Sequence, residues 1–261
     1  MIKITGRTEK GPVRATNEDS YSIAALESAA YVQDPAYLAV VCDGMGGENG
    51  GEVASMLAVE QITQTVRKSF RPDMGPNSVR DMLVSAIVSA NSVIYAKAHE
   101  DSDLYGMGTT VVACVVMGDT AYIANAGDSR AYYISGGSIT QITRDHTMVQ
   151  MYVEQGKISP DEAKNHPQKH LITRALGVEN EIQADYCEQS LAEGQKLVIC
   201  TDGLSNYVNA PSILELVNRS RDESPVDALV DKAIQMGGSD NITVVYIDGE
   251  QAVEVRETPA S

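Results

Sequence analysis

Short apolar runs of strand length recur along this chain, and they alternate with segments whose apolar residues have helical spacing. Apolar runs that alternate or are continuous predict strands at Ile2–Thr5, Tyr21–Leu26, Tyr37–Cys42, Thr109–Met117, Thr120–Ala124, Ala131–Ile134, Ile182–Cys187, Lys196–Cys200 and Ile242–Ile247. Helical spacing predicts helices at Gly51–Ser69, Ser78–His99, Ile213–Asn218 and Val226–Met236. Because strands adjacent in sequence favour antiparallel hairpins, we expect an α+β fold in which sheet packs on sheet and helices lie outside.

The pattern predicts one domain. The clearest candidate boundary is the Pro- and Gly-rich segment Arg71–Asn77, but it is short and is better interpreted as a connection between two helices. The segment His146–Gly177 is helical and loop-like, with proline breakers. We therefore predict a single domain over residues 1–250 and a polar tail over residues 251–261.

Composition and charge remove several classes of function. The chain has 261 residues and carries 36 acidic against 20 basic side chains, a formal net charge of −16. Such a charge argues against a nucleic-acid partner, because binding phosphates needs a basic surface. No apolar stretch approaches the roughly 20 residues of a membrane helix, and the N-terminus lacks the apolar core of a signal peptide. The four cysteines show no C-x-x-C pairing, so we expect reduced thiols and a cytoplasmic protein.

The most informative pattern is an apolar strand that ends in an Asp next to a Gly. It occurs at Asp43, Asp128 and Asp202, and a mirror version at Asp240 precedes the strand that begins at Ile242. If such carboxylates converged they would repel one another, and a divalent cation would remove that repulsion. A set of oxygen ligands favours Mg²⁺ or Mn²⁺ over zinc. The alternative is that each Asp-Gly is an ordinary turn, since the sequence does not show that the four meet.

A second candidate site is the hexapeptide Arg14–Asp19, RATNED. The guanidinium of Arg14 offers a rigid fork that suits a phosphate dianion, so this residue is a candidate substrate anchor. On the hexapeptide alone, an ordinary salt bridge between Arg14 and Glu18 or Asp19 is the favoured interpretation.

Six motifs taken together carry a family resemblance. They are R-x-x-N-E-D at Arg14–Asp19, D-G-M-G-G at Asp43–Gly47, G-D-S-R at Gly127–Arg130, D-H at Asp145-His146, T-D-G at Thr201–Gly203 and S-D-N-I-T at Ser239–Thr243. The series resembles the type 2C metal-dependent protein serine/threonine phosphatases (the PPM family), most closely the single-domain bacterial members. The motifs occur in that family's order and span about residues 5–247. The resemblance implies a four-layer α-β-β-α sandwich, two antiparallel sheets flanked by helix pairs, with a metal cleft at one end.

The resemblance also implies a ligand set for two Mg²⁺ or Mn²⁺ ions per chain. Asp43 would bridge the two metals, and the backbone oxygen of Gly44 would bind the second. Asp202 and Asp240 would hold the first metal. Asp128 together with Asp202 would hold the third metal that is seen in bacterial relatives.

Three further residues receive roles by the same resemblance. Glu18 and Asp19 would act mainly through metal-bound waters, and Arg14 would bind the substrate phosphate. A water activated by paired metals then attacks phosphorus, so no protein nucleophile is needed. The acid that protonates the leaving alkoxide is left open: a metal-bound water is one candidate, and His146 is expected to orient the loop after Asp145 instead.

The expected activity is hydrolysis of phosphoserine and phosphothreonine in phosphoproteins, which would reverse the action of a serine/threonine kinase. The expected state is a monomer with no nucleic-acid or membrane partner. One alternative is a non-catalytic phosphatase-like binding domain; another is a hydrolase of small phosphoesters. Residues 147–176 could form a movable flap over the cleft or an ordinary surface excursion. Glu48 stands where many bacterial relatives have His, and it is expected to face solvent.

Overall fold

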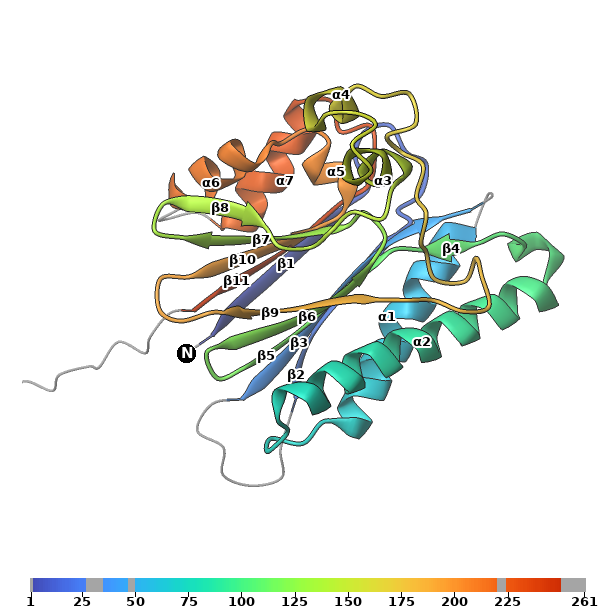
Figure 1. The fold of residues 1–261 in the computed structure, drawn as a ribbon, viewed down its shortest axis with the longest axis horizontal. Helices are drawn as coiled ribbons and strands as arrows, with labels where there is room; N and C mark the ends of the chain where they lie inside the picture. The colour runs from blue at the N-terminus through green and yellow to red at the C-terminus, as the bar shows by residue number, and fades with distance from the viewer. Residues whose placement is uncertain (1, 27–34, 47–49, 220–223, 250–261) are drawn as a thin grey trace, which may run out of the picture.

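Two antiparallel sheets pack face to face between helices in the computed structural model, which describes residues 2–26, 35–46, 50–219 and 224–249 (Figure 1). The first sheet has the order β1-β11-β10-β7-β8, with strands at Lys3–Glu9, Ile242–Asp248, Lys196–Cys200, Arg130–Ser135 and Ser138–Gln141. The second has the order β2-β3-β5-β6-β9, with strands at Asp19–Leu26, Ala36–Met45, Val111–Met117, Thr120–Ala126 and Asp185–Ser190. The short β4, Gly108–Thr109, pairs with the end of β3.

Helices cover the outer face of each sheet and complete the four layers that the sequence predicted (Figure 1). α1 (Gly50–Ser69) and α2 (Pro76–Glu100) lie on the second sheet, while α5 (Asp202–Ser205), α6 (Ala210–Arg219) and α7 (Pro225–Gln235) lie on the first. The short η1 is Ser102–Leu104. The expectation that no apolar stretch approaches membrane length is wrong for α2, which by length and composition alone is apolar enough to cross a membrane. Its buried face nevertheless belongs to the core on the second sheet.

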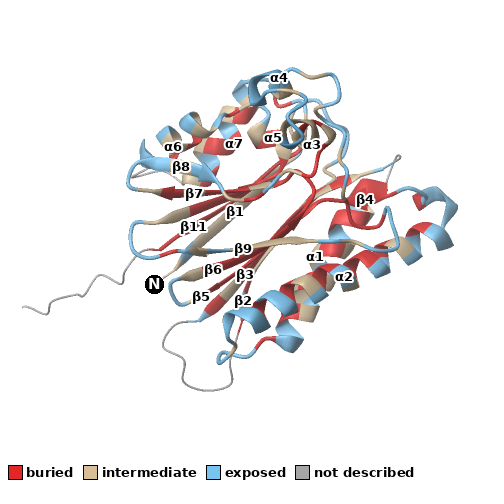
Figure 2. Ribbon diagram, viewed as in Figure 1, coloured by how far each residue is buried: buried red, intermediate tan, exposed pale blue. Residues whose placement is uncertain are grey.

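Burial on both faces explains why the central strands are continuously apolar. In β3, Val40 and Cys42 pack toward α1 and α2, whereas Ala39 and Val41 pack toward the opposite sheet. Side chains alternate along a strand, so Asp43 continues the row of Val41 and faces the space between the sheets. Figure 2 shows this buried centre in red across both sheets. The two-residue repeat therefore aims the Asp of the D-G-M-G-G motif between the two layers.

Most predicted strands are present, with shifted ends. β3 runs on to Met45, because Gly44 and Met45 pair with β4. The strand expected at Thr109–Met117 is interrupted at Thr110, whose Oγ1 accepts a hydrogen bond from the N–H of Asp43 at 3.0 Å. The strand expected at Ile182–Cys187 is instead β9, which begins at Asp185. β7 and β8 are joined by a hairpin turn at Gly136-Gly137, where both glycines have positive φ, 56° and 79°.

The segment between β8 and β9 rises over one end of the sandwich (Figure 1). It contains α3 (Met148–Glu154) and α4 (Pro160–Lys164), and α4 begins with a capping box formed by Ser159 and Glu162. A bridge between Thr147 and Ile172 closes its base. We call residues 147–176 the flap from here on. The single domain over residues 1–250 and the polar tail over residues 251–261 stay predictions, because the tail lies outside the described part of the chain. Glu48 also lies outside it, so its expected exposure to solvent stays a prediction.

Candidate functional site

The acidic residues of the motifs gather at one end of the sandwich, where strands of both sheets begin or end. In the second sheet, Asp19 opens β2 and lies directly opposite Asp43 of β3. In the first sheet, Asp202 follows β10 and Asp240 precedes the start of β11. β10 and β11 are neighbours, so these two acids enter from adjacent strands. Acids that are almost 200 residues apart in sequence therefore face one another across the two layers.

Asp19 is the most deeply placed member of this acid cluster. Its Oδ2 accepts hydrogen bonds from the hydroxyls of Thr201 at 2.9 Å and Thr243 at 2.7 Å, both on the opposite sheet. Its other oxygen, Oδ1, is buried and has no hydrogen-bond partner among the described residues. Burial raises the pKa of Asp19 to about 7, and the charges of Asp202 and Asp240 add to that rise. A buried carboxylate oxygen without a donor suits a cation.

The other aspartates share this electrostatic environment. Burial raises the pKa of Asp43 well above its ordinary value, and Asp19, Asp202 and Asp128 raise it further. Burial raises the pKa of Asp202 as well, and Asp240 adds to it. The pKa of Asp128 rises to about 7 through burial and then through the charge of Asp202. The structure thus brings together the four aspartates whose convergence the sequence could not show, and their mutual repulsion is what a divalent cation would relieve.

The acids are neighbours, but some of them bond to protein groups. Within residues 2–26, 35–46, 50–219 and 224–249, no three His, Cys, Asp or Glu side chains are arranged to hold one ion as they stand. Asp240 is bonded by Arg14, and Asp202 accepts a hydrogen bond from Asn206 at 2.9 Å. The donor set nevertheless fits Mg²⁺ or Mn²⁺, because all its atoms are oxygens and one of them is buried without a partner.

Arg14 lies at the rim of the cluster with about half of its side chain exposed. Its Nη2 donates to Asp240 at 2.9 Å, and its Nε donates to the backbone oxygen of Ser239. The salt bridge expected with Glu18 or Asp19 is therefore wrong in its partner, because the loop aims the guanidinium at Asp240. The remaining donors of Arg14, those of Nη1 among them, have no hydrogen-bond partner in the described chain.

Glu18 and Gly44 approach each other closely at the entrance to the cluster. The N–H of Gly44 donates to the backbone oxygen of Glu18 at 3.1 Å. A Cβ on Gly44 would lie 2.0 Å from the backbone oxygen of Gly51, so no other residue fits this crossing. Burial raises the pKa of the Glu18 carboxyl. The metal-binding roles predicted for Gly44 and Glu18 stay predictions.

Asn241 holds the loop that carries Arg14 and Glu18, a role that the sequence did not reveal. Its Nδ2 donates to the backbone oxygens of Lys10 and Thr16, both at 2.9 Å, and its Oδ1 accepts from the N–H of Glu18 at 2.8 Å. All three hydrogen bonds of the Asn241 side-chain amide thus go to one loop. The only sequence signal was its place in the S-D-N motif.

Thr110 fixes the loop of Asp128 against Asp43. Gly127 has a φ of +110°, and a Cβ there would lie 2.6 Å from the side chain of Thr110. The hydroxyl of Thr110 bonds Ser129 Oγ at 2.7 Å, and it also accepts from the Asp43 N–H. The spacing between the Asp128 loop and Asp43 is therefore set by one threonine.

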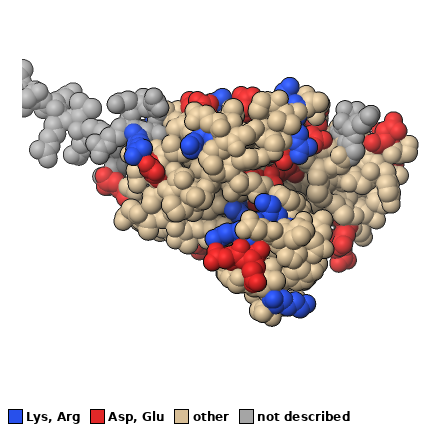
Figure 3. All heavy atoms as spheres, turned by 90° about the horizontal axis from the view of Figure 1, so that it is seen from above, with Lys and Arg blue, Asp and Glu red and all other residues tan. Residues whose placement is uncertain are grey.

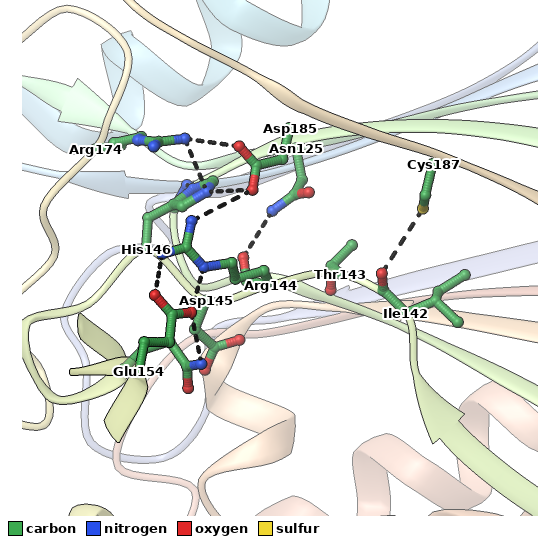
Figure 4. A network of polar contacts seen from close by, with 12 residues as sticks. Asn125, Ile142, Thr143, Arg144, Asp145, His146, Glu154, Arg174, Asp185 and Cys187 are labelled. Carbon is green, nitrogen blue, oxygen red and sulfur yellow. Dashed lines mark hydrogen bonds and ion pairs between the residues drawn. The ribbon is translucent and has the colours of Figure 1, made fainter. Parts of the chain in front are cut away.

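His146 holds the same loop from the other side, and its ring points toward Asp185 and Arg174 (Figure 4). The Gly127 N–H donates to His146 Nδ1 at 3.0 Å, and the His146 N–H donates to the Gly127 oxygen at 2.9 Å. Because Nδ1 accepts, Nε2 carries the proton, and it lies 3.2 Å from Asp185. Arg174 of the flap reaches the same carboxylate at 2.8 Å. His146 was expected to orient the loop after Asp145, but it instead positions the loop before Asp128, because that loop returns beside it.

His146 is buried, and burial lowers its pKa, so the neutral ring is favoured. Both of its nitrogens have protein partners. This arrangement fits a residue that holds a loop and does not fit one that gives a proton to a substrate.

A cleft of about 780 Å³ opens beside Asp128 and Asp202. β7 and β8 line its floor, α5 and the start of α6 form one wall, and the flap forms the other. Figure 3 views the molecule from the side of α4 and shows basic side chains on this face among acidic ones. The volume lies in the range of ordinary ligand sites.

Comparisons with known proteins agree with this geometry. The sequence model of the family described as Protein phosphatase 2C matches residues 14–241. The serine/threonine protein phosphatase PstP of Mycobacterium tuberculosis is 36% identical over 248 residues, which cover 95% of this chain and 45% of PstP. The serine/threonine phosphatase stp of Listeria innocua is 34% identical over 243 residues, which cover 93% of this chain and 94% of stp. This chain therefore spans less than half the length of PstP but nearly all of stp.

Solved structures give the same result. The crystal structure of the Mycobacterium tuberculosis phosphatase PstP/Ppp matches with a TM-score of 0.83 and 35% identity, and the match covers 96% of this chain and 99% of that one. The catalytic domain of the phosphatase PstP in complex with two manganese ions matches with a TM-score of 0.78 and 33% identity, over 95% of this chain and 97% of that one.

Proposed function

This chain belongs to the protein phosphatase 2C family, and we propose that it hydrolyses phosphoserine and phosphothreonine in phosphoproteins with the help of Mg²⁺ or Mn²⁺. One observation carries the proposal: Asp19, Asp43, Asp128 and Asp202 form one cluster with raised pKa values beside an open cleft. Clustering of buried acids at a cleft marks a functional site, because folding alone gains nothing from their repulsion. The chain also keeps Asp240 next to Asp202, so all four aspartates expected to bind metal are present, which argues against a non-catalytic binding domain.

The chain's own residues suit a pair of ions. Asp43 faces the gap between the sheets and would bridge the two metals, with the backbone oxygen of Gly44 beside it. Asp202 and Asp240 enter from adjacent strands and would hold the first ion, while Asp128 with Asp202 would hold a third. When bound, such ions lower the pKa of a bridging water and neutralise charge on the phosphate.

Glu18 and Asp19 differ in what they could contribute. Glu18 lies at the entrance, where its carboxylate could hold a water of the ion pair. Asp19 is held rigidly by Thr201 and Thr243, so its Oδ1 keeps a fixed direction. A fixed oxygen orients a bound water better than a mobile one does, because the cost of ordering it is met in folding.

Arg14 would bind the phosphate of the substrate. Its free N–H donors lie at the rim of the acid cluster, beside the guanidinium contacts with Asp240 and Ser239. A guanidinium pairs with two phosphate oxygens at once and stabilises the charge that develops on them. The proposal also includes phosphoprotein substrates, which the descriptions of the relatives support. It further includes an opposing serine/threonine kinase, a monomeric state and a cytoplasmic location.

One assay tests the proposal. Purified protein is given Mn²⁺ and either p-nitrophenyl phosphate or a phosphothreonine peptide, and phosphate release is measured with and without excess EDTA. We expect Asp202→Asn to abolish turnover, and Arg14→Ala to raise KM by about tenfold or more because a charge-assisted pair is lost. Asp161→Asn is the matched control, since Asp161 is exposed and contacts only Lys164. Activity that survives EDTA would exclude the proposed mechanism.

A further inference from the structure

The flap wall of the cleft carries basic side chains, and this is unusual in so acidic a chain. Residues 147–176 contain four Lys or Arg and two His against three Asp or Glu, whereas the whole chain has a net charge of −16. Lys164, Lys169 and His170 of the flap line the cleft together with Asp128 and Asp202. The cleft is therefore acidic at its inner end and basic on one wall.

Two of these basic side chains lack a protein anion. Arg130, the arginine that lines the cleft, forms a two-pronged pair with Asp145, at 2.6 and 3.0 Å. In contrast, the side chains of Lys169 and His170 make no hydrogen bond or ion pair with any described residue. Lys169 is also only partly exposed. A half-buried cation without an anion is costly unless some other group meets it.

Lys164 is less suited to a specific ligand contact than Lys169 and His170 are. It is 73% exposed and pairs only with Asp161, which lies in the same short helix and is 89% exposed. Such a surface pair is weak and leaves the lysine free to turn toward the cleft. We therefore place Lys164 at the mouth and assign the specific contact to Lys169 and His170.

His170 also lies within electrostatic reach of the catalytic end of the cleft. Its charge lowers the pKa of Asp202, although burial raises that pKa overall. The basic wall and the acid cluster are thus parts of one open space. When a substrate polypeptide binds with its phosphate at the acid cluster, the residues next to its phosphoresidue therefore lie along the flap wall.

An approaching phosphoprotein is repelled by a surface of net negative charge, and an acidic segment next to the phosphate is repelled most. At the flap wall, the basic side chains instead attract an acidic segment of the substrate. Apolar side chains of Val149, Val153 and Ala163 line the same space and reduce the screening of charge there.

On the basis of the proposed function, we propose that Lys169 and His170 form a subsite for a carboxylate of the substrate, so that this phosphatase prefers phosphoresidues flanked by Asp or Glu. The recognised ligand is the acidic side chain of a peptide, and the phosphate itself stays with Arg14 and the acid cluster. The subsite then sets substrate choice without taking part in bond breaking.

The test uses two phosphothreonine peptides of the same length, one flanked by Glu on both sides and one with Gln in those places. We measure kcat/KM of the Mn²⁺-loaded protein for each, and expect the acidic peptide to be favoured about five- to tenfold at low salt. The preference should shrink as salt shortens the reach of the charges. Lys169→Gln should reduce the ratio toward one, and Lys169→Glu should invert it, so that the Gln-flanked peptide becomes the better substrate.

Lys157→Gln is the matched control. Lys157 is on the same flap, but it stacks over Tyr152 and does not line the cleft, so its loss should leave the peptide ratio unchanged. Equal rates for the two peptides in the wild-type protein would overturn the subsite, as would an equal effect of Lys157→Gln and Lys169→Gln. Failure of the proposed function looks different: the wild-type protein would then release no phosphate from p-nitrophenyl phosphate or from either peptide.

Discussion

The buried carboxyl of Asp19 predicts that, without metal, the free energy of unfolding falls as pH rises toward about 7. The folded protein holds the Asp19 proton up to about pH 7, whereas an unfolded chain releases it near the ordinary pKa of 3.8. Between those values the folded state binds more protons than the unfolded state does, so the free energy of unfolding falls as pH rises. The loss is complete once pH exceeds the folded pKa. Asp128, whose pKa is also raised to about 7, acts in the same direction.

The size of the effect follows from the two pKa values. A carboxyl whose pKa rises from 3.8 to about 7 removes about 4 kcal/mol of stability across that interval, and Asp19 is buried, so little is lost to screening. Asp19→Asn removes the charge but keeps an oxygen that accepts from Thr201 and Thr243. We therefore expect the variant in EDTA to be more stable than wild type by up to about 4 kcal/mol at about pH 8, and the gap to close at about pH 4.

Urea unfolding followed by circular dichroism measures both proteins across this pH range in EDTA. Excess Mn²⁺ should then reverse their order at the higher pH, because the ionised cluster binds the cation and the folded state gains that binding energy. Asp161→Asn serves as the control, since its carboxyl is exposed and pairs only with Lys164. A wild-type protein whose stability in EDTA is flat or rises between about pH 4 and pH 7 would refute the reasoning.

Two further predictions concern the loops around the cluster. His146→Gln removes the clamp on Gly127, so we expect a loss of about 2–4 kcal/mol in urea unfolding and a higher Mn²⁺ concentration for half-maximal activity, with KM for the phosphoester little changed. A change in KM alone would contradict this positioning role. Asn241→Ala leaves the oxygens of Lys10 and Thr16 and the N–H of Glu18 without their partner, so we expect a loss of about 2–4 kcal/mol and a raised KM, because the Arg14 loop is released. An unchanged KM in a folded Asn241→Ala protein would show that the loop keeps its place without this residue.

The sequence predicted the strands well because burial on both faces leaves a clear signal. Tyr37–Cys42 is apolar throughout, since alternate residues pack on α1 and α2 or on the opposite sheet. The ends were less predictable, because pairing decides them: β3 continues through Gly44 and Met45 only because β4 lies beside them. The Asp43-Gly44 pair marks the end of the apolar run, but the strand itself ends later, at Met45.

The site was predictable in its acids and not in the residues that hold them. Asp19 received a role through water, yet the structure makes it the most deeply placed acid, because two threonines on the other sheet bond its Oδ2. Thr201 and Thr243 stand in the T-D-G and S-D-N-I-T motifs, but Thr is an ordinary strand residue, so the motifs did not indicate that these hydroxyls bond Asp19. Nothing in the sequence indicates that His170 lines the cleft, because histidine spacing alone does not show which side of a flap faces it.

The position of β11 has a consequence for folding during synthesis of the chain on the ribosome. This strand, Ile242–Asp248, lies in its sheet between β1 and β10, and Asp240 lies two residues before it. A nascent chain that has not yet extruded these residues has an open seam beside β1, and Thr243 cannot bond Asp19. We therefore expect phosphate hydrolysis to need a chain that reaches Asp248, and a product that ends before β11 to be inactive.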